Sequence, residues 1–431
     1  MTRFIVFILL VLVVVGIYPA LLLSRSKHSQ LRIDPVPKAI GLSTPLKLHV
    51  ENPHGVRKTT VWLEQNGAQE KVFEAVKPAH WLAWSVHEPA QDLAFTAVGK
   101  KDGKAKLIAE TVSNDLGGAK DTVAYDIDVI TRPPSVVADR AQHYINQGGS
   151  ELVAFTPSGY WSEAGVRAGR HSFRSFAKPG NSAERFSLFA FPWELESATV
   201  PVVFVRNAAG TEVTARFWHK VFRKKFRRRD IDLSDAFLDK VIGELDPGGS
   251  GDRLERFLKI NRQMRVENNK VLSDLRLKTT EKFLWSGAFL QLSNSKVESQ
   301  FADIRSYVYH GKKVDEQLHL GFDLSVVQHN PVVAANDGVV VWADRLGIYG
   351  NCIVVDHGFG LQSIYGHLSL IGLKAGEAVK KGQEMGRSGA TGLAGGDHLH
   401  FSMQVDGVQI NPGEWWDQHW IHDRILSKIN D

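Results

Sequence analysis

Short segments in which apolar and polar residues alternate recur along the first half of the chain. Residues 46–50 and 60–63 alternate in this way, and turn signals such as Asn66-Gly67 and Asp102-Gly103 separate the runs. Short alternating strands with regular turns are typical of β-sandwiches. The pattern predicts one β domain at residues 29–131 and, after a proline-containing linker at residues 131–134, a second at residues 132–228. Residues 200–205 and 211–218 read as a hairpin in the second domain.

The period then changes to that of a helix. Apolar residues recur at helical spacing after Ser234, and the glycine-rich stretch at residues 246–251 ends this first helix. Asp252 and Glu255 have the spacing of a capping box and predict the start of a second helical segment. We expect a helical spacer at residues 229–282. Strand and turn patterns return from Phe283 and predict a last domain at residues 283–420.

The N-terminus contains twenty apolar residues without a charge, from Phe4 to Leu23. This length spans a bilayer as one helix. The run continues into Ser24-Arg25 without a small-residue cleavage site, which favours an uncleaved signal anchor at residues 1–28 over a cleaved signal. Positive charges flank both ends, so the charge rule leaves the orientation open.

Composition excludes some classes of protein. The chain has 431 residues, a formal net charge of +5 and one cysteine, Cys352. The length suggests two to four domains. A single cysteine excludes a disulfide framework, so a metal site must use histidines and carboxylates. A basic cluster at residues 220–229 is either the solvated edge of a strand or a patch for an anionic polymer or lipid headgroups. The modest charge gives no argument for a nucleic-acid partner.

Candidate chemistry is concentrated in the last domain. His319 and Asp323 are four residues apart with Gly321 between them, which permits a sharp turn that brings both side chains to one point. His398 and His400 lie two apart in an alternating run and would enter one site from one face of a strand. Tyr365-Gly366-His367 and a glycine-rich stretch at residues 388–396 complete the set. Two histidines and a carboxylate are a common ligand set for catalytic zinc, and spare histidines suit proton transfer and stabilisation of an oxyanion.

These motifs and their order resemble the lysostaphin/LytM-type zinc endopeptidases, which cleave peptide cross-links of peptidoglycan. The first motif is His319-Leu-Gly-Phe-Asp323, and the second is His398-Leu-His400-Phe401. The resemblance covers about residues 285–415. It implies a small antiparallel β-fold related to the barrel-sandwich hybrid, one zinc ion bound by His319, Asp323 and His400, and catalytic roles for His367 and His398. His357 matches a recurrent family position and is assigned no catalytic role.

The resemblance stops short of the whole chain. The two upstream β domains resemble nothing more specific than an Ig-like sandwich, so the expected fold is mainly β with a short helical segment. Residues 299–305 stand where the family often has Phe-Gly followed by arginines, and an insert around residues 311–317 can shape the groove differently. The expected setting is the cell envelope, with a single-pass inner-membrane anchor, the catalytic domain in the periplasm and peptidoglycan as substrate.

Three further hypotheses concern activity and control. One alternative is a catalytically inactive regulator of other cell-wall hydrolases, which would not need intact metal ligands. A second is a lipoyl-type or biotinyl-type carrier, because residues 373–383 resemble a hairpin segment of such domains. A hydrolase near the membrane also needs restraint, so a β domain or the helical spacer is expected to cover the groove. The pattern leaves open whether the bond cleaved is a D,D-type link or a glycyl-glycine bridge.

Overall fold

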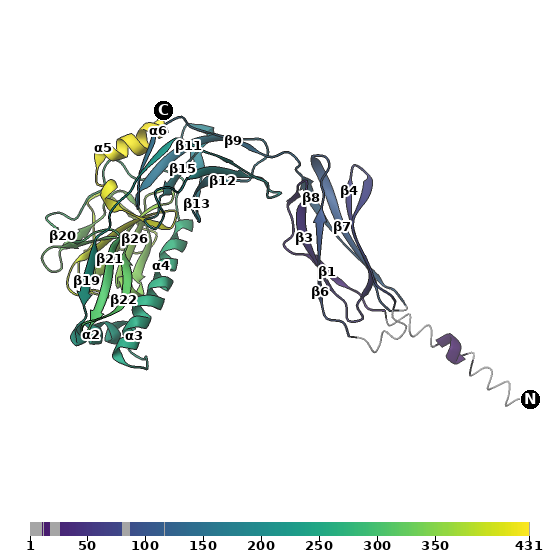
Figure 1. The fold of residues 1–431 in the computed structure, drawn as a ribbon, viewed down its shortest axis with the longest axis horizontal. Helices are drawn as coiled ribbons and strands as arrows, with labels where there is room; N and C mark the ends of the chain where they lie inside the picture. The colour runs from purple at the N-terminus through teal and green to yellow at the C-terminus, as the bar shows by residue number, and fades with distance from the viewer. Residues whose placement is uncertain (1–10, 12, 18–25, 80–86, 116, 431) are drawn as a thin grey trace, which may run out of the picture. The chain divides into compact units, whose positions relative to one another are not determined.

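The computed structural model describes residues 11, 13–17, 26–79, 87–115 and 117–430 (Figure 1). Most of the apolar run from Phe4 to Leu23 lies outside these residues. Within the described part of the chain, no helix combines the length and apolar character needed to cross a membrane. The chain divides into two units: residues 1–135 with 158–163 and 205–213, and residues 136–157, 164–204 and 214–431.

The first unit is a β-sandwich. Its sheets have the orders β1-β3-β6 and β2-β8-β7-β4-β5, and the alternating residues of their strands form one apolar core that includes Leu48, Val61 and Leu107. The strands are β1 (Gln30–Ile33), β2 (Ala39–Ile40), β3 (Thr44–Glu51), β4 (Val56–Gln65), β5 (Ala68–Val76), β6 (Gln91–Ala97), β7 (Gly103–Ser113) and β8 (Lys120–Val129). The two runs of alternating residues that predicted strands lie in β3 and β4.

A second group of strands forms two four-stranded sheets and a short pair. The sheet orders are β14-β15-β11-β9 and β13-β12-β16-β17, and β10 pairs with β18. The predicted hairpin is confirmed as the neighbours β16 and β17. The strands are β9 (Ser135–Ala138), β10 (His143–Asn146), β11 (Ser150–Ser158), β12 (Glu163–Ala168), β13 (His171–Arg174), β14 (Phe176–Lys178), β15 (Asn181–Ala190), β16 (Val202–Arg206), β17 (Glu212–Ala215) and β18 (His219–Phe222).

An eight-stranded sheet forms the centre of the C-terminal region. Its main order is β20-β23-β31-β27-β26-β25-β29, with β32 paired to β31. Two smaller sheets, β19-β21-β22 and β24-β30-β28, flank it. The expectation of a mainly β chain with a small antiparallel C-terminal domain is confirmed. The strands of the main sheet are β20 (Lys296–Ser299), β23 (Phe322–Ser325), β25 (Gly338–Arg345), β26 (Asn351–Asp356), β27 (Leu361–Leu368), β29 (Ala378–Val379), β31 (Leu399–Val405) and β32 (Val408–Ile410).

The flanking strands are β19 (Arg228–Asp232), β21 (Asp303–Tyr309), β22 (Lys312–His319), β24 (Pro331–Val333), β28 (Leu370–Ile371) and β30 (Glu384–Arg387). Strand β19 runs parallel to β21, with Arg229 opposite Arg305. The residues at the start of the expected spacer therefore belong to a sheet next to the catalytic strands. The insert around residues 311–317 forms the turn of the β21–β22 hairpin and most of strand β22.

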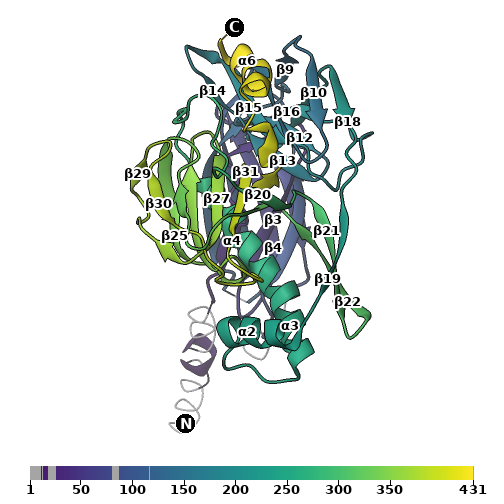
Figure 2. The same cartoon turned by 90° about the vertical axis from the view of Figure 1, so that its left-hand side faces the viewer.

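Helices α2 (Asp235–Leu245), α3 (Arg253–Lys259) and α4 (Arg265–Asp274) pack against the main sheet (Figure 2). Ser234 caps α2, and the capping box of Asp252 and Glu255 at the start of α3 is confirmed. A π-helical turn, Ile260–Met264, joins α3 to α4. Buried helix residues such as Leu238 and Leu272 share one apolar core with residues of β26 and β27. The helical segment therefore forms part of the core of the C-terminal domain.

Buried glutamines on the sheet fix the end of α4. The Nε2 group of Gln404 donates to the carbonyl of Leu272 at 2.8 Å, and that of Gln362 donates to the carbonyl of Leu275 at 2.9 Å. Each carbonyl also accepts a backbone N–H group, that of Leu272 from Leu275 and that of Leu275 from Lys278, so the glutamines add a second donor at the end of the helix. Gln404 lies four residues after His400 on β31, so the two side chains point to the same side of this strand. This side faces α4.

The chain ends in two short helices, α5 (Gln418–Ile421) and α6 (Ser427–Asn430). The side chain of Trp415, which precedes α5, is fully buried. Its neighbour Glu414 is also buried and accepts hydrogen bonds from Asn146 at 2.7 Å and from the Ser150 amide at 2.9 Å. Burial raises the pKa of Glu414 to about 7.

The basic cluster at residues 220–229 surrounds the start of β19. Arg227 forms an ion pair with Asp303, Arg228 pairs with Glu316 at 3.3 Å, and Arg229 donates to the carbonyl of Glu298 at 2.7 Å. Phe226 contacts Trp193 edge to face. Three of the basic side chains therefore already have partners within the domain, whereas Phe222 of the same cluster is exposed.

Candidate metal centre and active site

Three side chains from three strands converge at one point. His319 ends β22, Asp323 lies on β23, and His400 lies opposite Asp323 on β31. The distance from His319 Nε2 to Asp323 Oδ1 is 2.9 Å, and His400 Nδ1 lies 3.1 Å from the same oxygen. The two imidazole nitrogens are 3.0 Å apart. All three side chains are buried.

This donor set fits a zinc ion. Tetrahedral zinc with bonds of about 2.0–2.1 Å holds its ligand atoms roughly 3.3 Å apart, which is within a few tenths of an ångström of the observed separations. His319 Nδ1 lies 3.1 Å from the carbonyl of Gln300. A carbonyl can only accept, so Nδ1 carries the proton and the Nε2 lone pair faces the carboxylate. Such outer hydrogen bonds typically fix the tautomer of a metal-binding histidine.

Gly321 makes this convergence possible. A Cβ atom at this position would lie 2.7 Å from both Cε1 and Nε2 of His400, and 2.8 Å from the carbonyl oxygen of Phe401. The imidazole of His400 therefore occupies the space that a side chain at position 321 would need. The glycine in the first motif provides this space, in addition to the flexible turn that the sequence suggested.

Electrostatics keep the three groups in metal-binding form. Burial lowers the pKa of His319 to about 4, and burial likewise lowers the pKa of His400. Burial alone would raise the pKa of Asp323, but the neighbouring histidines outweigh it and hold that pKa well below its usual value. Neutral imidazoles and an ionised carboxylate are the forms that bind metals.

His367 and His398 face the same site from the other side. His367 Nδ1 lies 2.8 Å from the carbonyl of Thr391, and His398 Nδ1 lies 2.8 Å from that of Gly396. Both carbonyls can only accept, so Nδ1 of each histidine carries a proton and Nε2 points away from these anchors. The two rings are 4.8 Å apart between centroids, and His398 Nε2 lies 3.4 Å from Asp323 Oδ1.

The two histidines differ in environment. Burial, followed by the neighbouring His398 and His400, lowers the pKa of His367 well below its usual value. Burial would also lower the pKa of His398, but its hydrogen bond with Asp323 outweighs this and raises it. His367 has a φ of +62°, a left-handed conformation that is uncommon outside glycine and clusters at functional sites. The structure thus brings all five predicted site residues together, while their catalytic roles remain predictions.

Helix α2 anchors the loop that orients His367. Lys240 Nζ donates to the carbonyls of Ala390, Gly392 and Ala394 at 2.6, 2.9 and 3.2 Å. Glu244 Oε1 accepts from the Gly392 amide at 2.6 Å. These contacts hold the loop at Thr391, whose carbonyl accepts a hydrogen bond from His367 Nδ1. No local sequence pattern links α2 to this loop, so sequence reasoning missed both residues.

Arg305 is a third residue that sequence reasoning missed. Its Nη2 donates to Asp323 Oδ2 at 2.5 Å, which leaves Asp323 Oδ1 to the histidines. Arg305 lies on β21, within the segment that departs from the family pattern. His357 is not one of the convergent histidines. Its buried ring contacts the carbonyl of Asp337 and the hydroxyl of Ser363.

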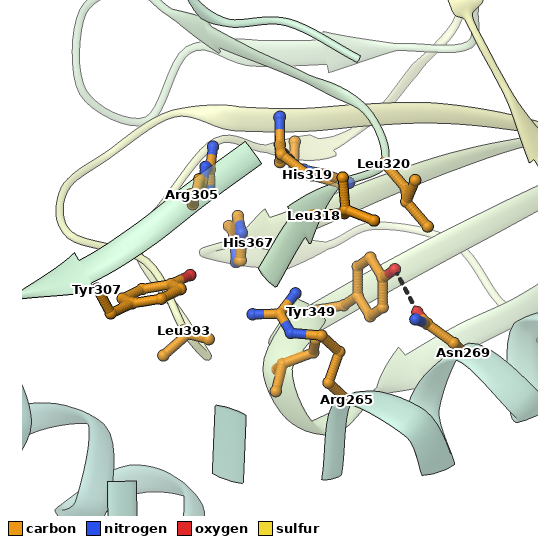
Figure 3. Close-up of a pocket in the computed structure, with 12 residues that line it drawn as sticks. Arg265, Asn269, Arg305, Tyr307, Leu318, His319, Leu320, Tyr349, His367 and Leu393 are labelled. Carbon is orange, nitrogen blue, oxygen red and sulfur yellow. Dashed lines mark hydrogen bonds between the residues drawn. The ribbon is translucent and has the colours of Figure 1, made fainter. Parts of the chain in front are cut away.

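Two hollows adjoin the site. A groove of about 390 Å³ has Asp323, His367 and His398 in its wall. This volume suits part of a peptide chain. A smaller cavity of about 40 Å³ lies between α4 and the metal site (Figure 3).

Comparison with known proteins gives matches to the C-terminal region. Residues 317–412 match the family model Peptidase family M23. The DD-carboxypeptidase/endopeptidase Mpg of Neisseria meningitidis serogroup B is 38% identical over 96 residues, or 22% of each chain. The peptidoglycan DD-endopeptidase ShyA of Vibrio cholerae is 40% identical over 93 residues, also 22% of each chain. The chain thus spans about a fifth of the length of these relatives.

Among solved structures, the catalytic domain of lysostaphin from Staphylococcus simulans is 24% identical with a TM-score of 0.22, covering 33% of this chain and 96% of that one. All five convergent side chains lie within the matched residues 317–412. The chain therefore contains a domain of Peptidase family M23, the LytM/lysostaphin type, over residues 317–412.

Proposed function

We propose that this chain is a zinc-dependent endopeptidase that cleaves peptide cross-links of bacterial peptidoglycan. The observation that carries the proposal is the convergence of His319, Asp323 and His400 beside two further histidines. The names of the M23 relatives, which are peptidoglycan DD-endopeptidases, support the substrate class. A D,D-type cross-link is therefore the bond that we expect to be cleaved.

Each residue has a task in this mechanism. Zinc held by the three ligands supplies a Lewis acid and lowers the pKa of a water molecule to about 7. The groove orients the peptide so that its scissile carbonyl faces the ligand cluster. His367 and His398, each held through Nδ1, direct Nε2 toward the reacting groups and can take up or deliver a proton there. Arg305 holds Asp323 Oδ2 by a hydrogen bond, which leaves Oδ1 turned toward the histidines.

The proposed setting is the periplasmic side of an inner membrane. The support is the uncharged apolar run from Phe4 to Leu23, which would anchor the chain near its peptidoglycan substrate. The free basic side chains of the cluster at residues 220–229 would lie toward anionic polymers or lipid headgroups. Release of the chain from membranes by detergent, and by neither salt nor alkaline wash, is the expected behaviour of an integral anchor.

The decisive experiment separates metal binding from turnover. His400→Ala should lose zinc and activity on purified sacculi, whereas His367→Ala should retain zinc and lose turnover. The alternative, an inactive regulator, predicts that the purified wild-type chain binds no zinc and gains no activity when zinc is added. Cleavage of sacculi by His367→Ala at the wild-type rate would show that the role assigned to His367 is wrong.

A further inference from the structure

The small cavity beside the metal site is positively charged. Its wall includes Arg265 and Asn269 of α4, Arg305 and Tyr307 of β21, and the histidines His367 and His400 (Figure 3). The lining residues include two arginines and no aspartate or glutamate. A cavity with unbalanced positive charge in a low-dielectric setting attracts an anion strongly.

Arg265 has no carboxylate partner. Its Nε donates to the Asn261 carbonyl at 3.0 Å, and its Nη2 donates to the Asn261 side-chain oxygen at 2.6 Å. Asn261 is fully buried and is itself held by Asp315 at 2.8 Å. Among the described residues, no acidic group lies within ion-pair distance of Arg265. The guanidinium is thus fixed in place while its charge remains uncompensated.

Arg305 has an unused hydrogen-bond donor among the described residues. Its Nη2 is used by Asp323, but its Nε is buried and has no hydrogen-bond partner in the part of the chain that the structure describes. A buried donor without a partner costs free energy. An acceptor in the adjoining cavity would remove this cost.

The cavity has the size of a carboxylate group. A water molecule needs about 10–15 Å³ by the same measure, so about 40 Å³ holds roughly three waters. Arginines recognise carboxylates through paired, charge-assisted hydrogen bonds. A neutral group of this size would leave the charge of Arg265 uncompensated, whereas that of Arg305 is already paired with Asp323.

We propose that Arg265 and Arg305 form a receptor for a free carboxylate of the substrate, on the amine side of the scissile amide. This inference rests on the proposed peptidase function. In a D,D link the carbon that carries the amide nitrogen also carries a free carboxylate. Within a glycyl-glycine bridge, the corresponding carboxyl group is part of the next amide. The receptor therefore selects D,D links, a choice that the metal chemistry alone leaves open.

The position of His367 supports the amine side. His367 lies in the wall of both the groove and the cavity, so a leaving amine that receives its proton in the groove would place the adjacent carboxylate near the cavity. Arg265 belongs to α4, which lies outside the matched residues 317–412. The helical segment thus supplies part of substrate recognition as well as part of the core.

The test compares free and amidated carboxylates in two substrates. One is an uncross-linked stem peptide ending in D-alanyl-D-alanine, and the other is a D,D-cross-linked dimer; each is prepared with the critical carboxylate free or as the carboxamide. The wild-type chain should prefer the free carboxylate in at least one substrate. The substrate that shows the preference identifies whether the bound carboxylate belongs to the stem peptide or to the cross-linked dimer. Arg265→Gln should lower kcat/KM for the free form by about tenfold to a hundredfold and leave the amide form unchanged.

Two controls keep the result interpretable. Lys270→Gln removes one positive charge from the same helix at an exposed position that pairs with Asp274 alone, and it should behave as wild type. Zinc content and affinity should be unchanged in Arg265→Gln. Equal rates for free and amidated substrates in the wild type, or equal losses in both for Arg265→Gln, would overturn the proposal.

A binding measurement separates this inference from the peptidase proposal. Acetyl-D-alanyl-D-alanine and its C-terminal amide are titrated into metal-free wild-type chain and metal-free Arg265→Gln by calorimetry. The free acid should bind the wild type at least tenfold more tightly than the amide, and Arg265→Gln should lose the difference. If no substrate is cleaved but this difference in affinity persists, the peptidase proposal is wrong and the carboxylate receptor is supported. Equal binding of acid and amide would show that the receptor proposal is wrong.

Discussion

Gly321→Ala tests whether the space beside His400 sets the geometry of the metal site. The added Cβ would lie 2.7 Å from Cε1 and Nε2 of His400, whereas ordinary contact begins at 3.4 Å. The backbone at position 321 has no left-handed φ, so alanine is conformationally acceptable and the effect is steric. The ring or the loop must therefore move by about 0.7 Å.

The backbone on the other side limits where this movement can go. The new Cβ would also lie 2.8 Å from the carbonyl oxygen of Phe401, which is on β31 opposite Phe322 of β23. Moving a paired strand is harder than turning a ring, so His400 should absorb most of the shift. Metal ligands must lie within about 0.2 Å of their proper distances. We expect zinc affinity to fall by about tenfold to a hundredfold, with a stability cost of about 1–3 kcal/mol.

The assay is competition between the metal-free chain and a chromogenic zinc chelator, with circular dichroism as the check on folding. Gly243→Ala is the matched control, because a Cβ at this exposed position in α2 meets nothing within 4 Å. It should leave zinc affinity unchanged and stabilise the helix by up to about 1 kcal/mol. A folded Gly321→Ala chain that binds zinc as tightly as the wild type would refute the steric reasoning.

Three more predictions follow from named contacts. Lys240→Met should lower kcat about tenfold by freeing the loop that orients His367, with zinc affinity unchanged; an unchanged kcat contradicts it. Because burial raises the folded pKa of Glu414 from 4.5 to about 7, its stabilising contribution is complete below pH 4.5 and is lost as pH rises through 7. Thermal melts should show wild type losing about 3 kcal/mol relative to Glu414→Gln across this window, and parallel pH profiles would exclude the effect. Zinc at a thousand times its Kd should stabilise the chain by about 4 kcal/mol, and a similar rise in Tm for His400→Ala would place the zinc elsewhere.

Local patterns predicted the parts of the fold that depend on neighbours in sequence. The alternating run at residues 46–50 lies in β3, and the Asp252–Glu255 capping box begins α3. The polar residues of β31 were expected on one face. His400 and Gln404 do share a polar environment there, because Gln404 binds the end of α4. Periodicity of 2.0 and 3.6 residues is sufficient for such predictions.

Contacts between distant segments left no signal in the sequence. Lys240 reaches a loop 150 residues away, and Arg265 faces a cavity whose other walls begin at β21. Both residues appear in the sequence as ordinary polar positions of an amphipathic helix. Their roles depend on how α2 and α4 dock on the sheet, which buried glutamines and the shared apolar core determine. The sequence pattern predicted a spacer for these helices because local periodicity does not show which surface a helix packs against.

The expected restraint on activity by a β domain or the helical spacer stays a prediction. Helix α4 places Arg265 and Asn269 in the wall of the cavity next to His400. A truncation that begins near Phe283 would remove α4 together with buried core residues such as Phe257 and Leu272. Such a truncated chain should lose stability, so single substitutions on α4 test restraint better than deletion does.

Digestion of purified sacculi, followed by mass spectrometry of the released products, tests the central claim most directly. The zinc-loaded wild-type chain should release peptides whose masses place the break at the D-alanyl cross-link, and His400→Ala should release none above background. An intact cross-link after prolonged digestion by wild-type chain with zinc bound would contradict the claim that this metal centre is a peptidoglycan endopeptidase.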